Sequence, residues 1–205
     1  MISNIAVYNE KYLYKGIKYE NNSIDILLSK ISKKRRIILC SHSILIKKYN
    51  YKGNNIDRFI DNKISEDFSN RENLLFHYEI DKNKKDIYLY SIRNDNIKKL
   101  YIDAKELVIE PIQFKVKKYL KNKIKGFGKF IIFYKVNKLS HLVKVQNDLI
   151  TDTIISEDIN EIINYFIKAK DNNYIFIKDK NIEEINGISF HYVLDLGVDA
   201  FEKIC

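Results

Sequence analysis

The chain has 205 residues, of which 45% are hydrophobic and 31% charged, a balance that excludes intrinsic disorder and suits one compact domain or two small lobes. No apolar run approaches the roughly 20 residues of a membrane-spanning helix, and the N-terminus lacks the basic and apolar regions of a signal peptide, so we expect neither. The two cysteines, Cys40 and Cys205, exclude a disulfide framework and indicate free thiols in the cytoplasm.

The formal net charge of +9 would suit nucleic acid, an anionic membrane or an acidic partner. Lys, Ile and Asn are abundant throughout, however, and all three have A/T-rich codons, so base composition accounts for much of the Lys excess. The one tight basic run, residues 33–36, falls where a helix is expected to end, and a helix C-terminus favours cations. We therefore predict no dedicated nucleic-acid patch.

The first third of the chain alternates short strands with helices. Residues 2–7 and 11–19 read as a β-hairpin. Ser23 is a suitable N-cap for a helix whose apolar residues recur at helical spacing: Ile24, Leu27, Leu28 and Ile31. Residues 36–40 are typical of a strand buried on both faces, and residues 44–49 predict another strand after a turn.

The middle of the chain continues this alternation. Asn55 is expected to cap a helix with the apolar stripe Ile56, Phe59, Ile60, Ile64 and Phe68. Residues 74–80 and 86–92 predict a hairpin. A helix is expected over residues 94–107, from the spacing of Ile97, Leu100, Tyr101 and Ala104. Pro111 suits the first turn of a further helix, with the stripe Ile112, Val116, Tyr119, Leu120 and Ile124.

The last third begins with three predicted strands, at residues 130–134, 141–145 and 149–154, the last two joined by a tight turn at Asn147-Asp148. Ser156 is expected to cap a helix that runs to about residue 170, with Ile159, Ile162, Ile163 and Phe166 facing inward. Residues 174–178 predict a buried strand, residues 186–187 a turn and residues 189–204 a helix. The alternation predicts an α/β fold with a mixed sheet whose faces are covered by helices.

The order of these elements resembles the cytoplasmic actin-like proteins of type IV pilus and type II secretion machines, the PilM and GspL families. Five segments carry the resemblance: residues 36–49, 56–78, 86–113, 130–155 and 193–204. It implies an actin-like (ribonuclease H-like) fold with two lobes, trimmed because the chain is short for the family. Residues 1–125 would form the first lobe, with a small inserted subdomain at about 36–92, and residues 126–205 the second.

The chain departs from the family at the nucleotide site. ATP-binding relatives are expected to carry Asp-x-Gly in the first hairpin, Asp-x-Gly-x-x-Thr in the second and a Gly-Gly turn. Here the first hairpin reads VYNE (residues 7–10), the second reads YKVNKL (134–139), and no Gly-Gly occurs. Glycine lets backbone amides approach phosphate, and the aspartates hold the metal-phosphate group. Lys138 could contact a phosphate only as a lone charge, so we predict no ATP and no other cofactor.

Other patterns that might mark a site have simpler structural explanations. His42, His77, His141 and His191 form no two-His metal motif. His77 and Glu79 share one face of a predicted strand, which could begin a metal or acid-base site, but we favour an exposed or packed strand pair. In Cys40-Ser41-His42, neighbouring side chains on a strand point to opposite faces, so a nucleophile is not expected.

The remaining candidates are explained in the same way. The adjacent carboxylates Glu66-Asp67 and Glu183-Glu184 would not face each other on a helix. The 15 Tyr and 11 Phe invite a stacking platform for single-stranded nucleic acid, but most alternate with aliphatic residues in strands and belong to the core. We therefore predict no catalytic, cofactor-binding or metal-binding residues.

The resemblance implies a non-enzymatic cytoplasmic scaffold of a type IV pilus or type II secretion assembly platform, peripheral to the inner face of the cell membrane. It would bind the cytoplasmic tail of a bitopic inner-membrane partner (PilN-like), in the cleft between the lobes or along an exposed strand edge. The assembly ATPase is a further expected partner, homodimerisation is compatible with the resemblance, and nucleic acid is not expected. No residues are assigned to the partner site.

Two alternatives from other classes stay open. One is a nucleic-acid-binding protein with a ribonuclease H-like core, whose nuclease forms need several acidic residues around a metal; Asp86 and Asp152 are the candidate members here. The other is an ATP-binding actin-like protein, which the missing glycines oppose.

Overall fold

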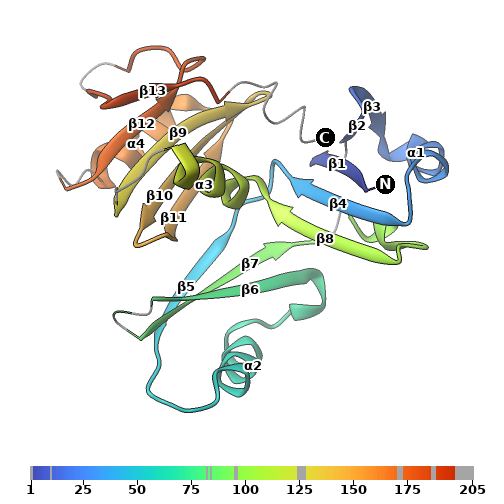
Figure 1. The fold of residues 1–205 in the computed structure, drawn as a ribbon, viewed down its shortest axis with the longest axis horizontal. Coiled ribbons are helices and arrows are strands. Elements are labelled where there is room, and N and C mark those ends of the chain that lie inside the picture. The colour runs from blue at the N-terminus through green and yellow to red at the C-terminus, as the bar shows by residue number, and fades with distance from the viewer. Residues whose placement is uncertain are drawn as a thin grey trace. The chain divides into compact units, whose positions relative to one another are not determined.

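The computed structural model describes residues 2–9, 11–81, 83, 85–94, 97–123, 128–169, 173–185 and 188–196. The chain divides into two compact units, one made of Met1–His42 with Asn96–Cys205 and the other of Ser43–Asp95. Two five-stranded sheets lie in the first unit and a three-stranded sheet in the second (Figure 1). Sheets with parallel and antiparallel pairs, together with helices, confirm the predicted α/β class. The assignment of residues 1–125 and 126–205 to two lobes, with a subdomain at 36–92, stays a prediction.

The first sheet has the strand order β3-β2-β1-β4-β8. Its strands are β1 (Ser3–Tyr8), β2 (Lys11–Tyr14), β3 (Ile17–Glu20), β4 (Lys34–Leu39) and β8 (Glu106–Pro111). β1, β2 and β3 pair antiparallel, whereas β4 runs parallel to both β1 and β8. The predicted hairpin of residues 2–19 is therefore a three-stranded meander, because Lys15 and Gly16 adopt φ angles of 50° and 75° and reverse the chain.

A short helix, α1 (Ile24–Lys30), follows the 3₁₀ turn η1 (Asn21–Ser23) and contacts β3. Ile24 and Leu27 are buried, as the apolar spacing predicted. Ser23 holds the N-cap position but makes no capping bond to the helix; its hydroxyl donates instead to the carbonyl oxygen of Glu20 at 3.0 Å.

The helix predicted over residues 94–107 is wrong. The structure has a 3₁₀ turn, η3 (Lys98–Tyr101), followed by strand β8. Arg35 explains the difference, because its guanidinium donates to the carbonyl oxygens of Leu100 at 2.9 Å and Ile102 at 2.7 Å, which a helix would use internally. Asp103 then adopts a φ angle of 56°, which ends any right-handed helix.

Helix α3 (Ile112–Lys123) begins directly after β8, so Pro111 is the last residue of the strand rather than part of the first helical turn. The predicted stripe is inward: Ile112, Val116 and Leu120 are almost fully buried. Of the other two predicted members, Tyr119 is half-buried, and Ile124 lies outside the described residues.

The second sheet has the strand order β11-β10-β9-β12-β13. Its strands are β9 (Lys129–Val136), β10 (Leu139–Gln146), β11 (Leu149–Ser156), β12 (Ile175–Asp179) and β13 (Tyr192–Leu194). β9, β10 and β11 pair antiparallel, and Asn147 and Asp148, both with positive φ, form the predicted tight turn. β12 runs parallel to β9 and β13.

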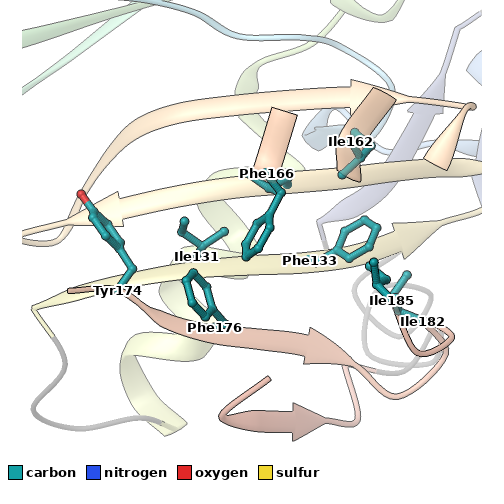
Figure 2. Close-up of a cluster of buried hydrophobic side chains, with 9 residues drawn as sticks. Ile131, Phe133, Ile162, Phe166, Tyr174, Phe176, Ile182 and Ile185 are labelled. Atoms are coloured by element: carbon teal, nitrogen blue, oxygen red, sulfur yellow. The ribbon is translucent and has the colours of Figure 1, made fainter. Parts of the chain in front are cut away.

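Helix α4 (Ile159–Ala169) covers one face of this second sheet. Figure 2 shows Ile162 and Phe166 of α4 with Ile131 and Phe133 of β9 and Phe176 of β12. The helix starts three residues later than Ser156, which is the last residue of β11; the Ser156 hydroxyl instead accepts a hydrogen bond from the Asp158 amide at 3.0 Å. The buried side chains of α4, β9 and β12 form an apolar core on this face of the second sheet.

The helix predicted over residues 189–204 is wrong where the structure describes it. Tyr192–Leu194 is strand β13, because its apolar residues pair parallel with β12, from Ile177 to Asp179. The predicted turn at residues 186–187 and the rest of the predicted helix, residues 197–204, lie outside the described residues.

The second unit is a three-stranded antiparallel sheet, ordered β5-β7-β6, with one helix against it. Its elements are β5 (Leu45–Asn50), α2 (Ile56–Asp67), the 3₁₀ turn η2 (Arg71–Asn73), β6 (Leu74–Asp81) and β7 (Asp86–Arg93). Asn55 caps α2 as predicted, accepting a hydrogen bond from the Arg58 amide at 3.0 Å. Ile60 and Phe68 pack on Ile87 and Leu89 of β7 to form its core.

Candidate functional site

The turn of the first hairpin, between β1 and β2, is held by hydrogen bonds to the segment that follows β4. The Asn9 amide donates to the hydroxyl of Ser41 at 2.6 Å, and the Cys40 amide donates to the Val7 carbonyl oxygen at 2.9 Å. Asn9 has a φ angle of 49° and carries a side chain where glycine would leave the backbone open. A backbone amide that could face a phosphate here already has an acceptor within the protein.

The second hairpin turn, between β9 and β10, consists of Asn137 and Lys138. Asn137 adopts the left-handed conformation with a φ angle of 58°, and both side chains are exposed. Lys138 lies in the turn as the sequence indicated. With no glycine in this turn, a phosphate would meet side chains before it met backbone amides.

The strands behind this second turn carry a buried pair of aromatic rings. Tyr134 and His141 face each other across β9 and β10, and their rings stack with centroids 4.8 Å apart and planes 14° apart. Both are fully buried, and neither ring nitrogen of His141 has a hydrogen-bond partner among the described residues. Burial lowers the pKa of His141 to about 3, so the imidazole is neutral in the folded chain near pH 7.

Helix α3 adds a buried amide to the same unit. The Gln113 side chain is fully buried, its Nε2 donates to the carbonyl oxygen of His42 at 3.2 Å, and within the described ranges its Oε1 has no partner. Cys40 lies close enough to Tyr134 to raise the pKa of that phenol, although burial is the larger cause. Buried polar groups are thus present in this part of the first unit.

The two candidate nuclease carboxylates lie in different units. Asp86, in the second unit, forms an ion pair with Lys48 at 2.8 Å and accepts a hydrogen bond from Asn50 at 3.3 Å. Asp152, on β11 of the first unit, is partly buried, and this burial raises the pKa of its carboxyl group. Across the residues that the structure describes, no three His, Cys, Asp or Glu side chains gather in a way that could hold a metal ion.

His77 and Glu79 occupy one face of β6 with Tyr90 of β7. The Tyr90 hydroxyl donates to Glu79 Oε2 at 3.1 Å, and the His77 ring stacks on the Tyr90 ring with centroids 6.0 Å apart. These are cross-strand contacts of an antiparallel sheet, since His77 lies opposite Tyr90 in the register.

The basic run at residues 33–36 is used within the fold. Lys34 forms an ion pair with Glu106 across β4 and β8. Arg35 is only 4% exposed and binds three carbonyl oxygens, those of Ser32, Leu100 and Ile102. As predicted, the run lies where a strand begins after a helix: Lys33 lies between α1 and β4, and residues 34–36 are the first three residues of β4. Arg35 therefore fastens the loop before β8 to the first sheet.

The paired carboxylates and His191 also have structural partners. Asp67 accepts a hydrogen bond from Tyr49 and pairs with Lys47 at 3.1 Å, while Glu66 pairs with Lys63. Glu183 and Glu184 are exposed in a loop. His191 Nδ1 accepts a hydrogen bond from the Phe176 amide at 3.0 Å and so helps hold the segment before β13 against β12.

A shallow pocket of about 270 Å³ lies at the start of α2 in the second unit. The rings of Tyr51 and Phe59, with centroids 5.1 Å apart, form part of its wall, and Lys52 and Arg58 add two exposed cations. No sequence pattern predicts this pocket, because its shape depends on how the loop at residues 51–54 folds against α2.

The architecture is that of the actin-like ATPase fold. It has two mixed sheets, each with a hairpin (β1–β2 and β9–β10), and a three-stranded insert after β4. Within the described ranges, none of the helices combines the length and apolar character needed to cross a bilayer. The fold is present, as predicted, while both hairpin turns carry side chains in place of glycine.

Solved structures share this fold at very low sequence identity. A Bacteroides thetaiotaomicron protein with an actin-like ATPase fold and unknown function is 10% identical, with a TM-score of 0.64 over 99% of this chain and 95% of that one. The cytoplasmic domain of EpsL, an inner-membrane component of the Vibrio cholerae type II secretion system, is 6% identical, with a TM-score of 0.59 over 98% and 92%. These likenesses establish the fold.

The PilM–PilN type IV pilus biogenesis complex matches more weakly, at 7% identity and a TM-score of 0.47 over 82% of this chain and 61% of that one. That similarity is too low to support an argument about this chain. No protein-family model matches the sequence, and no curated protein matches it.

Proposed function

We propose that this chain is a non-enzymatic scaffold of a membrane-associated assembly platform, of the type II secretion or type IV pilus kind. In this role it binds the cytoplasmic tail of a bitopic inner-membrane protein and works at the inner face of the membrane. The assembly ATPase is a second proposed partner.

The observation that carries the proposal is the first hairpin turn. The Asn9 amide is bonded to Ser41, and the corresponding second turn consists of Asn137 and Lys138 without glycine. An actin-like fold that bound ATP would need open backbone amides and metal-holding aspartates at these turns. Retaining the fold without them favours a role in which the protein holds partners.

Two further features support the same role. The fold is shared with the cytoplasmic domain of EpsL, whose setting is an inner-membrane secretion machine. The net charge of +9 is suited to a position beside anionic lipid headgroups, where each nearby Lys or Arg contributes about 1 kcal/mol of attraction.

The first experiment tests the partner. The chain is co-expressed with candidate single-span membrane proteins, taken from any that are encoded beside it, and each complex is purified through a tag on the membrane protein. We expect the full-length membrane protein to retain the chain. A matched membrane protein that lacks its cytoplasmic tail is expected not to retain it. Equal retention by both forms, or retention by neither, would contradict the proposal.

The second experiment tests the ATP alternative. Thermal unfolding is followed with and without Mg-ATP, for the native chain and for Ser41→Ala, which frees the Asn9 amide. We expect no shift for either, because the missing glycines and aspartates remain missing. A saturable shift in the native chain would establish nucleotide binding instead. Steeply salt-dependent retention on single-stranded DNA, without partner binding, would favour the nucleic-acid alternative.

A further inference from the structure

The edge strands of the three sheets differ in how they are protected against pairing with another chain. Natural sheets guard their edges with short strands, lysine, proline, bulges or inward charges. β3 and β13 are short, with four and three residues, and β8 ends in Pro111. β5 carries Lys47 and Lys48, and β11 carries Asp152 beside a register shift at Lys144/Val145.

β6 is the exception among these edges. It is eight residues long, reads LLFHYEID, and contains no Pro, Gly, Lys or bulge. Within the described part of the chain it pairs with β7 alone, and no backbone hydrogen bond there joins its outer edge to another element. The seven residues before Asp81 combine high β-propensity with low net charge, as in segments that add to a neighbouring strand.

The sequence of β6 is complementary to itself in the antiparallel direction. If two copies pair with Tyr78 on the two-fold axis, His77 of one copy lies opposite Glu79 of the other, and the symmetry repeats this pair. Phe76 lies opposite Ile80 in the same register. Moving the axis to Glu79 would instead place two carboxylates opposite each other, which is unfavourable.

We propose that β6 is the interface of a two-fold homodimer, in which β6 pairs with β6 of a second copy of this chain. The three-stranded sheet of each second unit then becomes half of a continuous six-stranded sheet. Two-fold pairing uses the same surface on both copies, as closed dimers do. The proposal does not depend on the membrane partner.

The contacts within each copy support this geometry. Tyr90 donates to Glu79, and a carboxylate accepts several hydrogen bonds at once, so the imidazole of the second copy adds to that bond. On the other face of β6, Ile80 is 37% exposed although it is large and apolar, and Phe76 is half-buried. Pairing of Ile80 with Phe76 of the second copy would remove apolar surface from water.

The first test is a charge swap read by sedimentation velocity over a wide range of concentrations. His77→Glu places carboxylates opposite each other twice, and we expect the dimer to weaken by about tenfold or more. Glu79→His alone is also expected to weaken it. The double variant His77→Glu/Glu79→His exchanges the two partners and is expected to restore dimerisation to within about threefold of the native chain.

The controls separate interface effects from loss of folding. Ile80→Lys on β6 should weaken the dimer, whereas Val108→Lys, at a residue 51% exposed on the edge strand β8, should leave it unchanged. Circular dichroism of each variant checks that the fold is intact. In a Cys205→Ser background, Tyr78→Cys should cross-link between copies on oxidation, because residues on the axis face each other.

Two results would overturn the proposal. One is a chain that stays monomeric at every concentration, including one that binds a partner's tail along β6 as a monomer. The other is a dimer that none of His77→Glu, Ile80→Lys or Tyr78→Cys affects or traps. Failure of the membrane-partner experiment leaves these readings unchanged, so the two proposals are tested separately.

Discussion

The second sheet buries both of its faces, but with different chemistry. The face beneath α4 is apolar, with Ile131, Phe133 and Phe176 against Phe166. On the opposite face, Tyr134 and His141 stack among aliphatic residues. Burial of apolar side chains lowers the free energy of the folded state. Burial of an imidazole that makes no hydrogen bond raises it, because the ring loses its hydration. The first face therefore stabilises the fold by burying apolar surface. The contribution of the second face depends on the protonation state of His141.

The largest expected effect is on the α4 face. Phe166→Ala removes a ring that is 3% exposed and leaves a cavity, and we expect the free energy of unfolding to fall by about 4 kcal/mol. Ile167→Ala, one residue along but 57% exposed, should change it by less than about 0.5 kcal/mol. Urea unfolding measures both. Similar losses from the two variants would contradict the one-sided packing of α4.

The next effect is the pH dependence of the opposite face. The pKa of His141 is about 3 in the folded chain and about 6.5 when unfolded, so between these values the unfolded state binds the extra proton. Stability is therefore highest above pH 6.5 and falls as the pH is lowered toward 3, by about 2 kcal/mol at pH 5.

His141→Phe is the matched variant, because it keeps a ring on Tyr134 and removes the titrating group. Urea unfolding at pH 7 and pH 5 is expected to show about 2 kcal/mol less pH dependence in this variant than in the native chain. Equal pH dependence in the two proteins would mean that the imidazole is charged or solvated in the fold.

The smallest effect is expected at the turn between β9 and β10, the two strands that contribute side chains to both faces of the second sheet. Asn137 has a φ angle of 58°, which alanine adopts less readily than asparagine or glycine. Asn137→Ala should lower the free energy of unfolding by about 1 kcal/mol, and Asn137→Gly should lower it less. Thermal unfolding of the two variants measures the difference. If alanine were as stable as asparagine, the turn would not hold that conformation in solution.

The sequence predicts elements whose side chains follow a single period. The apolar stripe of α4 and the alternation of β9 and β10 are visible without the structure, and the register then places Tyr134 opposite His141. Residues 94–107 could not be predicted in this way. The helical spacing of Ile97 and Leu100 competes there with Arg35, a residue 65 positions earlier that takes the Leu100 carbonyl oxygen.

The candidate site was partly visible for the same reason. The absence of glycine from the two turns can be read directly from residues 7–10 and 134–139. The bond from the Asn9 amide to Ser41 joins residues 32 apart, and local pattern carries no information about such a contact. That no described residue hydrogen-bonds the His141 ring likewise depends on what surrounds the ring in space.

The position of the second unit in the chain bears on how the first sheet forms. β4 and β8 are neighbours in that sheet, yet Lys34 pairs with Glu106 across the whole of the insert. Closing so long a loop carries an entropy penalty that slows folding. Within the insert, however, Leu45 near its start pairs with Ser91 near its end. Once the insert has folded, its two ends are held together. We therefore expect the entropy penalty for pairing β8 with β4 to be that of a short connection.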